Sequence, residues 1–236
     1  MLAGVIAEQA TIPPPSGGGI AFVGSRQNSN TSGALTVSLT GLTGGSSSTP
    51  SPGDIVLLAV SFGATGNGDI TVSSSGWTEI SDLYANDSRD INFGLFYKIM
   101  SDPVDTSVTF GGTNPRVAIA SVWSGVDQTT PLDVTKVEAT GANSGVIDPP
   151  AITPTTTGAK VIAAGGATNV SAATDTLSSD LDNFVWAAQS HGSFRAYVGI
   201  GKADWTAGSY NPSSWGGSVS VDDTWAATTI ALRPAA

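Results

Sequence analysis

The 236-residue chain contains no cysteine and little charge, and each absence excludes a class of structure or site. Without cysteine there are no disulfides and no thiolate metal ligands, so stability has to come from the apolar core or from partner subunits. Charged residues make up only 12% of the sequence, against roughly a quarter in a typical globular protein. The surface must therefore be polar through serine, threonine, asparagine and glycine.

Basic residues are especially few. Nine Lys and Arg stand against nineteen Asp and Glu, which gives a net charge of −10 and an isoelectric point near 4.2. The nine are scattered along the chain, whereas phosphate backbones are bound by clustered lysine and arginine. The sequence therefore predicts no nucleic-acid partner, and the acidic balance is expected to keep the protein soluble.

Long apolar runs and helical periodicity are missing as well. No segment reaches the roughly 18 consecutive apolar residues of a membrane-spanning helix, so no membrane partner is expected. Residues 1–19 have no basic stretch, and Glu8 interrupts their short apolar run, so they do not resemble an export signal. No stretch places apolar residues at helical spacing over three turns, which predicts almost no helix.

The chain does contain a pattern that occurs twice, over residues 53–126 and 158–234. Each copy runs from an apolar segment through polar loops to an aromatic segment, and closes on a second apolar segment. Turn residues separate these segments at intervals typical of sandwiches and jelly rolls. We therefore predict an all-β fold: a single antiparallel, jelly-roll-like β-sandwich domain over residues 20–236, built from two similar halves whose sheets face each other.

The residues before this domain have a different character. Residues 1–19 begin with a mildly apolar stretch, continue through a Pro-Pro-Pro run that favours extended geometry, and end in a flexible Ser-Gly-Gly-Gly segment. This order predicts a short extended arm that anchors the protein on a partner; a frayed terminus is the alternative. The residues expected to dock are Met1, Leu2, Val5, Ile6, Ile12, Pro13 and Pro14.

No arrangement of catalytic residues is recognisable. His191 is the only histidine, and no Gly-x-Ser-x-Gly segment precedes a helix as a serine nucleophile would require. Glycosidases need two acids, whereas Glu79, on the same expected strand face as Trp77, has no second acid in a similar context. We therefore predict a protein that is not an enzyme, with no catalytic residue and no cofactor.

Two loops gather the oxygen donors that calcium prefers, at residues 86–90 and 180–183. Neither matches a twelve-residue calcium loop with its terminal glutamate, and Arg89 adds positive charge to the first. Plain turn chemistry, in which Asp and Asn bond to their own backbone, is the other explanation. A structural calcium therefore stays an alternative, and no metal ligand is assigned.

The six tryptophans divide into two groups. Trp205 and Trp215 flank the polar segment 206–214, which contains Tyr210. Exposed aromatic rings on such a loop can stack on sugars or anchor a protein interface, and packing of the loop itself is the third explanation. Trp205, Tyr210 and Trp215 are therefore the candidate contact residues for a host surface glycan or a protein partner. The other four are expected in the core: Trp77, Trp123, Trp186 and Trp225.

Short motifs along residues 20–236 resemble a β-sandwich module of tailed-phage and prophage virion proteins. In chain order they are Gly53-Asp54 before an apolar run, Gly76-Trp77-Thr78, Phe96-Tyr97-Lys98, Val122-Trp123-Ser124-Gly125-Val126-Asp127, Thr130-Pro131-Leu132-Asp133 and the closing Ala231-Leu232-Arg233-Pro234-Ala235. The resemblance implies a protein that is synthesised in the host cytoplasm and located on the virion surface. It supplies no catalytic residues.

A small module behind a short arm resembles a capsid decoration or head-spike protein more than a full tail fibre. The resemblance therefore implies a structural protein that docks on other virion proteins, of the capsid or the tail. A homo-oligomer, with a trimer as the specific expectation, follows by analogy. A continuous apolar run such as 55–60 is buried on both faces of its sheet or covered by a neighbouring subunit. The alternative function is a tail-fibre-type module that binds a receptor or glycan through its loop aromatics.

Overall fold

The structure is a computed structural model that describes residues 19–64, 66–87, 89–111, 116–142, 144–168, 178–191, 194–216 and 223–236. These residues form fourteen β-strands and no helix, so no helix among them could span a membrane. Every strand pairing between them is antiparallel. The predicted all-β, antiparallel sandwich is confirmed.

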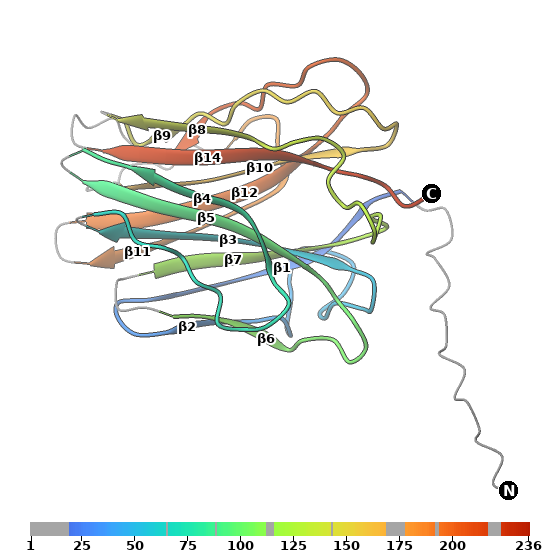
Figure 1. Ribbon diagram of the computed structural model, residues 1–236, viewed down its shortest axis with the longest axis horizontal. Coiled ribbons are helices and arrows are strands. Elements are labelled where there is room, and N and C mark those ends of the chain that lie inside the picture. The colour runs from blue at the N-terminus through green and yellow to red at the C-terminus, as the bar shows by residue number, and fades with distance from the viewer. Residues whose placement is uncertain are drawn as a thin grey trace, which may run out of the picture.

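Two five-stranded sheets pack face to face (Figure 1). In spatial order, the first sheet consists of β1 (Ala21–Asn30), β7 (Arg116–Ser124), β3 (Ile55–Ala64), β5 (Asp90–Ile99) and β4 (Thr78–Ala85). The second sheet consists of β11 (Asp182–His191), β12 (Phe194–Asp204), β10 (Lys160–Thr168), β14 (Thr224–Leu232) and β8 (Val137–Ala142). Two small pairs complete the fold: β2 (Leu35–Ser38) with β6 (Ser107–Phe110), and β9 (Val146–Ile147) with β13 (Trp215–Gly216).

The strand order repeats with a period of seven. Adding seven to each strand number turns the first sheet, β1-β7-β3-β5-β4, into the second, β8-β14-β10-β12-β11, and turns the pair β2-β6 into β9-β13. The correspondence therefore includes β1, β2, β8 and β9, which lie outside the ranges 53–126 and 158–234. In the stack, β1 lies against β11 and β4 against β8, so the halves are arranged approximately as a twofold pair.

The apolar core has three layers. The layer between the sheets includes Leu57, Phe93, Trp123, Val198 and Ile230. The layer outside the first sheet, under β2 and β6, includes Leu39, Leu58, Phe62 and Phe110. The layer outside the second sheet, under β9 and β13, includes Ile147, Ile152, Val161 and Trp215. Residues 55–60 are completely buried, because the chain's own segments cover both faces of β3. The apolar run therefore needs no neighbouring subunit to cover it, and the expected oligomer rests on analogy alone.

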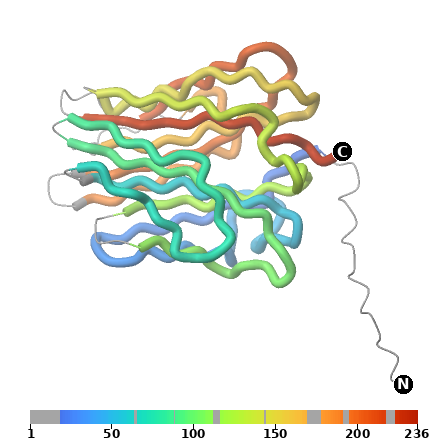
Figure 2. The backbone as a smooth tube through the Cα atoms, viewed as in Figure 1, coloured from blue at the N-terminus to red at the C-terminus, as the bar shows by residue number. Residues whose placement is uncertain are grey.

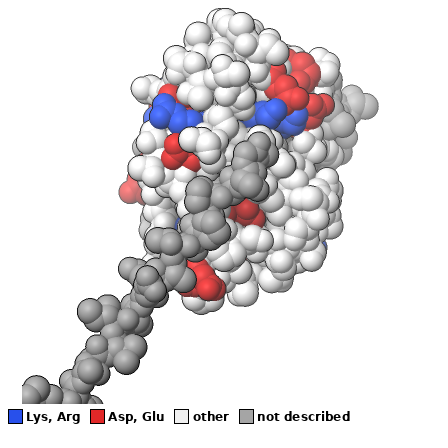
Figure 3. Space-filling view, turned by 90° about the vertical axis from the view of Figure 1, so that its right-hand side faces the viewer, with Lys and Arg blue, Asp and Glu red and all other residues white. Residues whose placement is uncertain are grey.

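Both ends of the sandwich's chain lie at one end of the molecule (Figure 2). Ala21, at the start of β1, pairs with Ser124, and the backbone N–H of Ala235 donates a hydrogen bond of 2.9 Å to the carbonyl of neighbouring Gly125. Figure 3 looks onto this end, where charged side chains form a few small groups on a mostly uncharged surface. The docking residues expected in the arm lie outside the described residues: Met1, Leu2, Val5, Ile6, Ile12, Pro13 and Pro14.

Candidate binding groove

The segment 206–214 packs on the second sheet. Trp215 lies in β13 and is only 1% exposed, and its ring meets Phe184 edge-on with 5.2 Å between the ring centroids. The expectation of an exposed ring at Trp215 is therefore wrong. The physical reason is that β9 and β13 cover the outer face of the second sheet, which places this ring in an apolar layer.

Trp205 and Tyr210 are half-buried against the same layer. The indole N–H of Trp205 donates a hydrogen bond of 2.8 Å to the carbonyl of Gly208. Tyr210 exchanges two backbone hydrogen bonds with Ile152, of 2.8 and 2.9 Å. These contacts fit the explanation that the loop packs on itself and on the sheet. The contact role expected of Trp205 and Tyr210 stays a prediction, since each ring keeps an exposed part.

One carboxylate fixes this segment to the start of β11. Asp180 accepts hydrogen bonds from the Tyr210 hydroxyl (2.8 Å), the Ser213 backbone N–H (3.0 Å) and the Ser178 hydroxyl (3.0 Å). Burial would raise the pKa of Asp180, but the bonds from Ser213 and Tyr210 outweigh it and lower that pKa. Burial and the bond to Asp180 raise the pKa of Tyr210. Two of these three partners, Tyr210 and Ser213, lie about thirty residues away along the chain, so the contacts of Asp180 differ from the local backbone turn that was the alternative to calcium.

The loop at residues 86–90 is held by contacts with residues outside it. The Tyr84 hydroxyl donates a hydrogen bond of 2.5 Å to Asp90, and Arg89 forms an ion pair of 3.4 Å with Asp223. Among the described residues, no three His, Cys, Asp or Glu side chains come together in a way that could hold a metal ion. The side chain of His191 lies outside the described residues.

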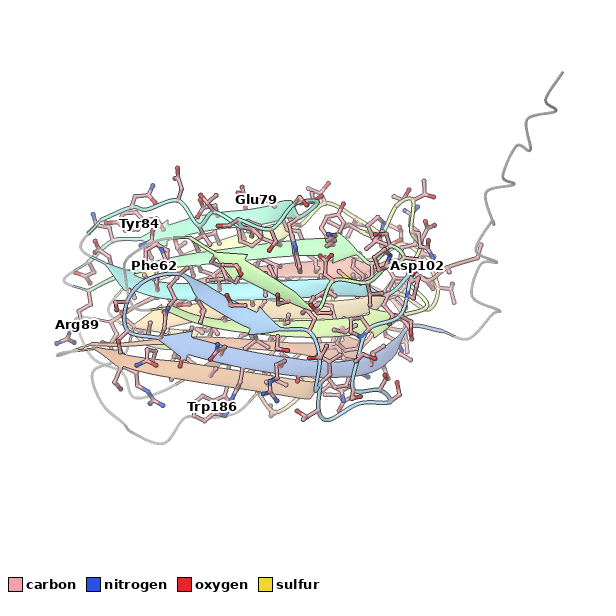
Figure 4. All side chains as sticks on the ribbon, turned by 90° about the horizontal axis from the view of Figure 1, so that it is seen from below. Phe62, Glu79, Tyr84, Arg89, Asp102 and Trp186 are labelled. Atoms are coloured by element: carbon pink, nitrogen blue, oxygen red, sulfur yellow. The ribbon has the colours of Figure 1, made fainter. Side chains whose placement is uncertain are left out.

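A second acid does accompany Glu79, which the sequence reasoning missed. A β-bulge in β4 between Glu79 and Ser81 leaves Ile80 and Ser81 both buried and places Glu79 and Asp82 both on the exposed side. Burial and then the charges of Glu79 and Asp69 raise the pKa of Asp82. The bulge breaks the alternation by which the sequence assigns strand faces. Glu79 lies on the opposite side of the molecule from Trp186 (Figure 4).

A groove runs along the side of the sandwich where the edge strands β1 and β11 lie against each other. It consists of two hollows of about 530 and 620 Å³, whose walls share Gln27 and Trp186. Small-molecule sites usually have volumes of roughly 300 to 1,000 Å³. We call this feature the β1–β11 groove, and its described lining residues are Phe22, Ser25, Arg26, Gln27, Asn28, Ser29, Thr43, Gly44, Asn183, Phe184, Val185, Trp186, Ala187, Ala188 and Arg195.

Three half-buried aromatic rings line the groove: Phe22, Phe184 and Trp186. Each is supported by a second ring, since Phe22 packs 4.9 Å from Trp123 and Trp186 packs 6.3 Å from Tyr197, while Phe184 meets Trp215. Trp186 points outward from this side of the molecule (Figure 4). The sequence placed Trp186 in the core, and the structure places it at the border between an apolar layer and solvent.

The polar part of the lining carries positive charge and amides. Arg26, Gln27, Asn28 and Asn183 are exposed, and the guanidinium of Arg195 lies 5.7 Å from the centroid of the Trp186 ring. No described lining residue is an aspartate or glutamate. In a chain with a net charge of −10, this makes the groove a local exception.

Both strands that line the groove carry a β-bulge there. The register of β1 shifts between Phe22 and Gly24, and that of β11 shifts between Asp182 and Val185. Asn183 has a φ of 50°, a left-handed conformation that is uncommon for residues other than glycine and that asparagine tolerates best. Bulges bend edge strands and re-aim side chains, and these two bulges direct Phe22 and Phe184.

A third hollow, of about 420 Å³, differs from the β1–β11 groove in its lining. Its described lining contains no aromatic ring, and its one cation, Lys98, forms an ion pair of 2.6 Å with Asp105. The combination of aromatic rings, amides and arginine therefore distinguishes the β1–β11 groove from this hollow.

Comparison with known proteins gave no match, whether with protein-family models, with curated proteins or with solved structures. The functional argument therefore depends on this chain's own residues and geometry, together with the motif resemblance described above.

Proposed function

We propose that this protein is a non-enzymatic structural protein of a tailed-phage virion, which docks on other virion proteins and displays a β-sandwich on the particle surface as a capsid decoration or head spike. The observation that carries the proposal is the position of both ends of the sandwich at one end of the molecule. An anchor at residues 1–19 would hold that end and leave the groove side and the far end facing outward.

Two further features support this role. Charged side chains are sparse at the end where the chain leaves the sandwich (Figure 3), and the cores of protein interfaces are depleted in charge. Both sheets have their outer faces covered by segments of the same chain. The sandwich can therefore project from a particle without exposing an apolar sheet face.

Gold labelling of intact virions with an antibody against residues 20–236 tests the proposal. Label over the head supports a decoration or spike, and virions without label contradict a virion role. Deletion of residues 1–19 provides the matching test of the anchor. The shortened protein should fold, with an unchanged unfolding midpoint, and should no longer attach to particles that lack the full-length protein.

The second candidate is a tail-fibre-type module that binds a receptor or glycan. The β1–β11 groove favours it, because rings and amides that line one hollow are typical of ligand sites. Gold label at the tail tip would select this candidate over the decoration.

A further inference from the structure

We propose that the β1–β11 groove binds an acidic polysaccharide chain, whose sugar rings stack on Trp186 and whose carboxylates are held by Arg26. The site itself is independent of the virion role. Only the source of the glycan, the surface of a bacterial host, rests on the proposed function.

The length of the groove suits a chain-like ligand. Its lining follows β1 from Phe22 to Ser29, a distance of about 23 Å at the usual rise of a strand. The two hollows share Gln27 and Trp186, so a ligand can pass from one to the other beside the same ring. A single sugar would occupy only a fraction of this length.

The aromatic and amide side chains match the chemistry of a sugar. One face of a pyranose ring is apolar and packs on aromatic rings, whereas its rim carries hydroxyls that both donate and accept hydrogen bonds. Trp186 and Phe184 supply partly exposed rings. The side-chain amides of Gln27 and Asn183 are exposed and form no hydrogen bond with other described residues, so both are available to sugar hydroxyls.

The charge of Arg26 selects an acidic sugar. Arg26 is exposed, and among the described residues its guanidinium donates only to the carbonyl of Gly41, at 3.2 Å. Arg116 is buried over the ring of Phe62. The remaining basic residues outside the groove each form an ion pair with a carboxylate: Arg89, Lys98, Lys136, Lys160, Lys202 and Arg233.

A guanidinium fork can hold a carboxylate through two parallel hydrogen bonds. Arg195 lies in the same wall, over the ring of Trp186. Acidic groups elsewhere on the chain repel an anionic polymer, which leaves the groove as the favourable approach. The lining that is described contains no carboxylate, whereas glycoside hydrolysis needs two, so the inference is binding without cleavage.

A peptide strand is the other class of occupant that such a groove could admit, by pairing with the outer edge of β11. Its affinity would come from main-chain hydrogen bonds. It would depend little on the Arg26 guanidinium or on the indole of Trp186, so side-chain variants separate the two classes.

The test measures binding of the purified full-length chain to an array of acidic and neutral bacterial capsular polysaccharides. Binding to one or more acidic polysaccharides, with neutral ones at background, is expected. Trp186→Ala and Arg26→Gln should each weaken it by about tenfold or more, and Arg26→Lys should retain part of it. Trp77→Ala is the matched control, because Trp77 is also half-buried but precedes β4, at the opposite edge of the first sheet.

Unfolding midpoints of all variants are measured in parallel, and Trp186→Phe replaces the alanine variant if that variant does not fold. The inference is overturned if no acidic polysaccharide binds, if neutral polysaccharides bind equally well, or if the groove variants bind like the wild type. Loss of binding in Trp205→Ala alone would move the site to the segment 206–214. Unlabelled virions combined with groove-dependent glycan binding would remove the virion role and keep the site.

Discussion

At the scale of single residues, the buried carboxylate of Asp133 joins three segments of the chain. It accepts hydrogen bonds from the backbone N–H groups of Thr155 (2.6 Å) and Thr156 (3.1 Å), and the side chain of Arg233 approaches it to 3.4 Å. Burial would raise the pKa of Asp133, but hydrogen bonds from Thr156 and Thr155 outweigh it and lower that pKa to about 2. Asp133 belongs to the Thr-Pro-Leu-Asp motif of the sequence. These contacts give the motif a structural role, because its aspartate connects segments that are far apart along the chain.

Asp133→Asn should therefore destabilise the protein in a pH-dependent way. The pKa falls from 3.8 in the unfolded chain to about 2 in the folded one, which corresponds to about 2 kcal/mol. Since the folded pKa is the lower one, this stabilisation is present above about pH 4 and is lost as the pH falls toward about 2. Urea unfolding at neutral pH and at about pH 3 should show the gap between wild type and variant shrinking with acid.

Asp148→Asn is the control, because Asp148 is exposed and its replacement should leave stability within about 0.5 kcal/mol. A gap for Asp133→Asn that stays constant from neutral to acidic pH would show that the lost stability is steric instead of electrostatic.

The residues of the candidate site show what the sequence could not decide. Trp215 has polar neighbours in sequence, yet Phe184 and Ile147, far away along the chain, bury it. Trp186 has apolar neighbours in sequence, yet β11 is an edge strand, so its ring reaches solvent. Which strand is an edge depends on long-range pairing, and local composition does not carry that information. For the candidate site, the sequence offered local evidence only of the two β-bulges, through Gly24 in β1 and Asn183 in β11.

At the scale of elements, the two open sides of the sandwich differ although the strand order makes them equivalent. On the side opposite the groove, Lys136 precedes β8 and reaches the first sheet, where its ammonium donates hydrogen bonds to the carbonyl of Ile80 and, at 3.5 Å, to the hydroxyl of Ser81. Lys136 also forms an ion pair of 2.5 Å with Glu138 in β8. This lysine joins β4 to β8, whereas the equivalent side of the sandwich carries the groove along β1 and β11.

Lys136→Met should loosen the β4–β8 side and leave the groove unchanged. The thioether chain keeps most of the apolar stem, so the loss is chiefly that of the charged hydrogen bonds between sheets, about 1 to 3 kcal/mol. Hydrogen exchange of the β8 amides should become faster, while that of β1 and β11 should not. Lys160→Met is the comparison, because its partner Asp204 is largely exposed and such pairs contribute about 0 to 1 kcal/mol. Equal losses in the two variants would contradict a joining role for Lys136.

At the scale of the whole molecule, the sequence was sufficient for the fold class because buried central strands are continuous apolar runs. Ile55–Ala64 and Lys160–Thr168 are such strands, and each pairs with the aromatic strand and the closing strand of its own half. That the repeat extends to β1, β2, β8 and β9 could not be recognised from the sequence. β1 and β8 are edge strands with few large apolar side chains, and β9 and β13 have only two residues each. Their correspondence is visible only in the strand order.

The same arrangement predicts that neither half folds alone. Leu57, Phe93 and Trp123 in the first sheet are buried only because Val198 and Ile230 in the second sheet face them. A cut between Gln128 and Thr129, which are both exposed, separates the sheets without interrupting a strand. Residues 19–128 expressed alone should lack cooperative unfolding or associate with themselves, since the exposed inner face of a sheet is strongly apolar.

Coexpression of residues 19–128 with residues 129–236 should restore a one-to-one complex, with cooperative unfolding and the far-ultraviolet spectrum of the intact chain. Its unfolding midpoint should depend on protein concentration, because joining the fragments is now bimolecular. A first fragment that stays monomeric and unfolds cooperatively would contradict the shared central layer. A stable homodimer of that fragment would instead indicate that the approximate twofold pair can be rebuilt from two copies of one half, as the seven-strand period allows.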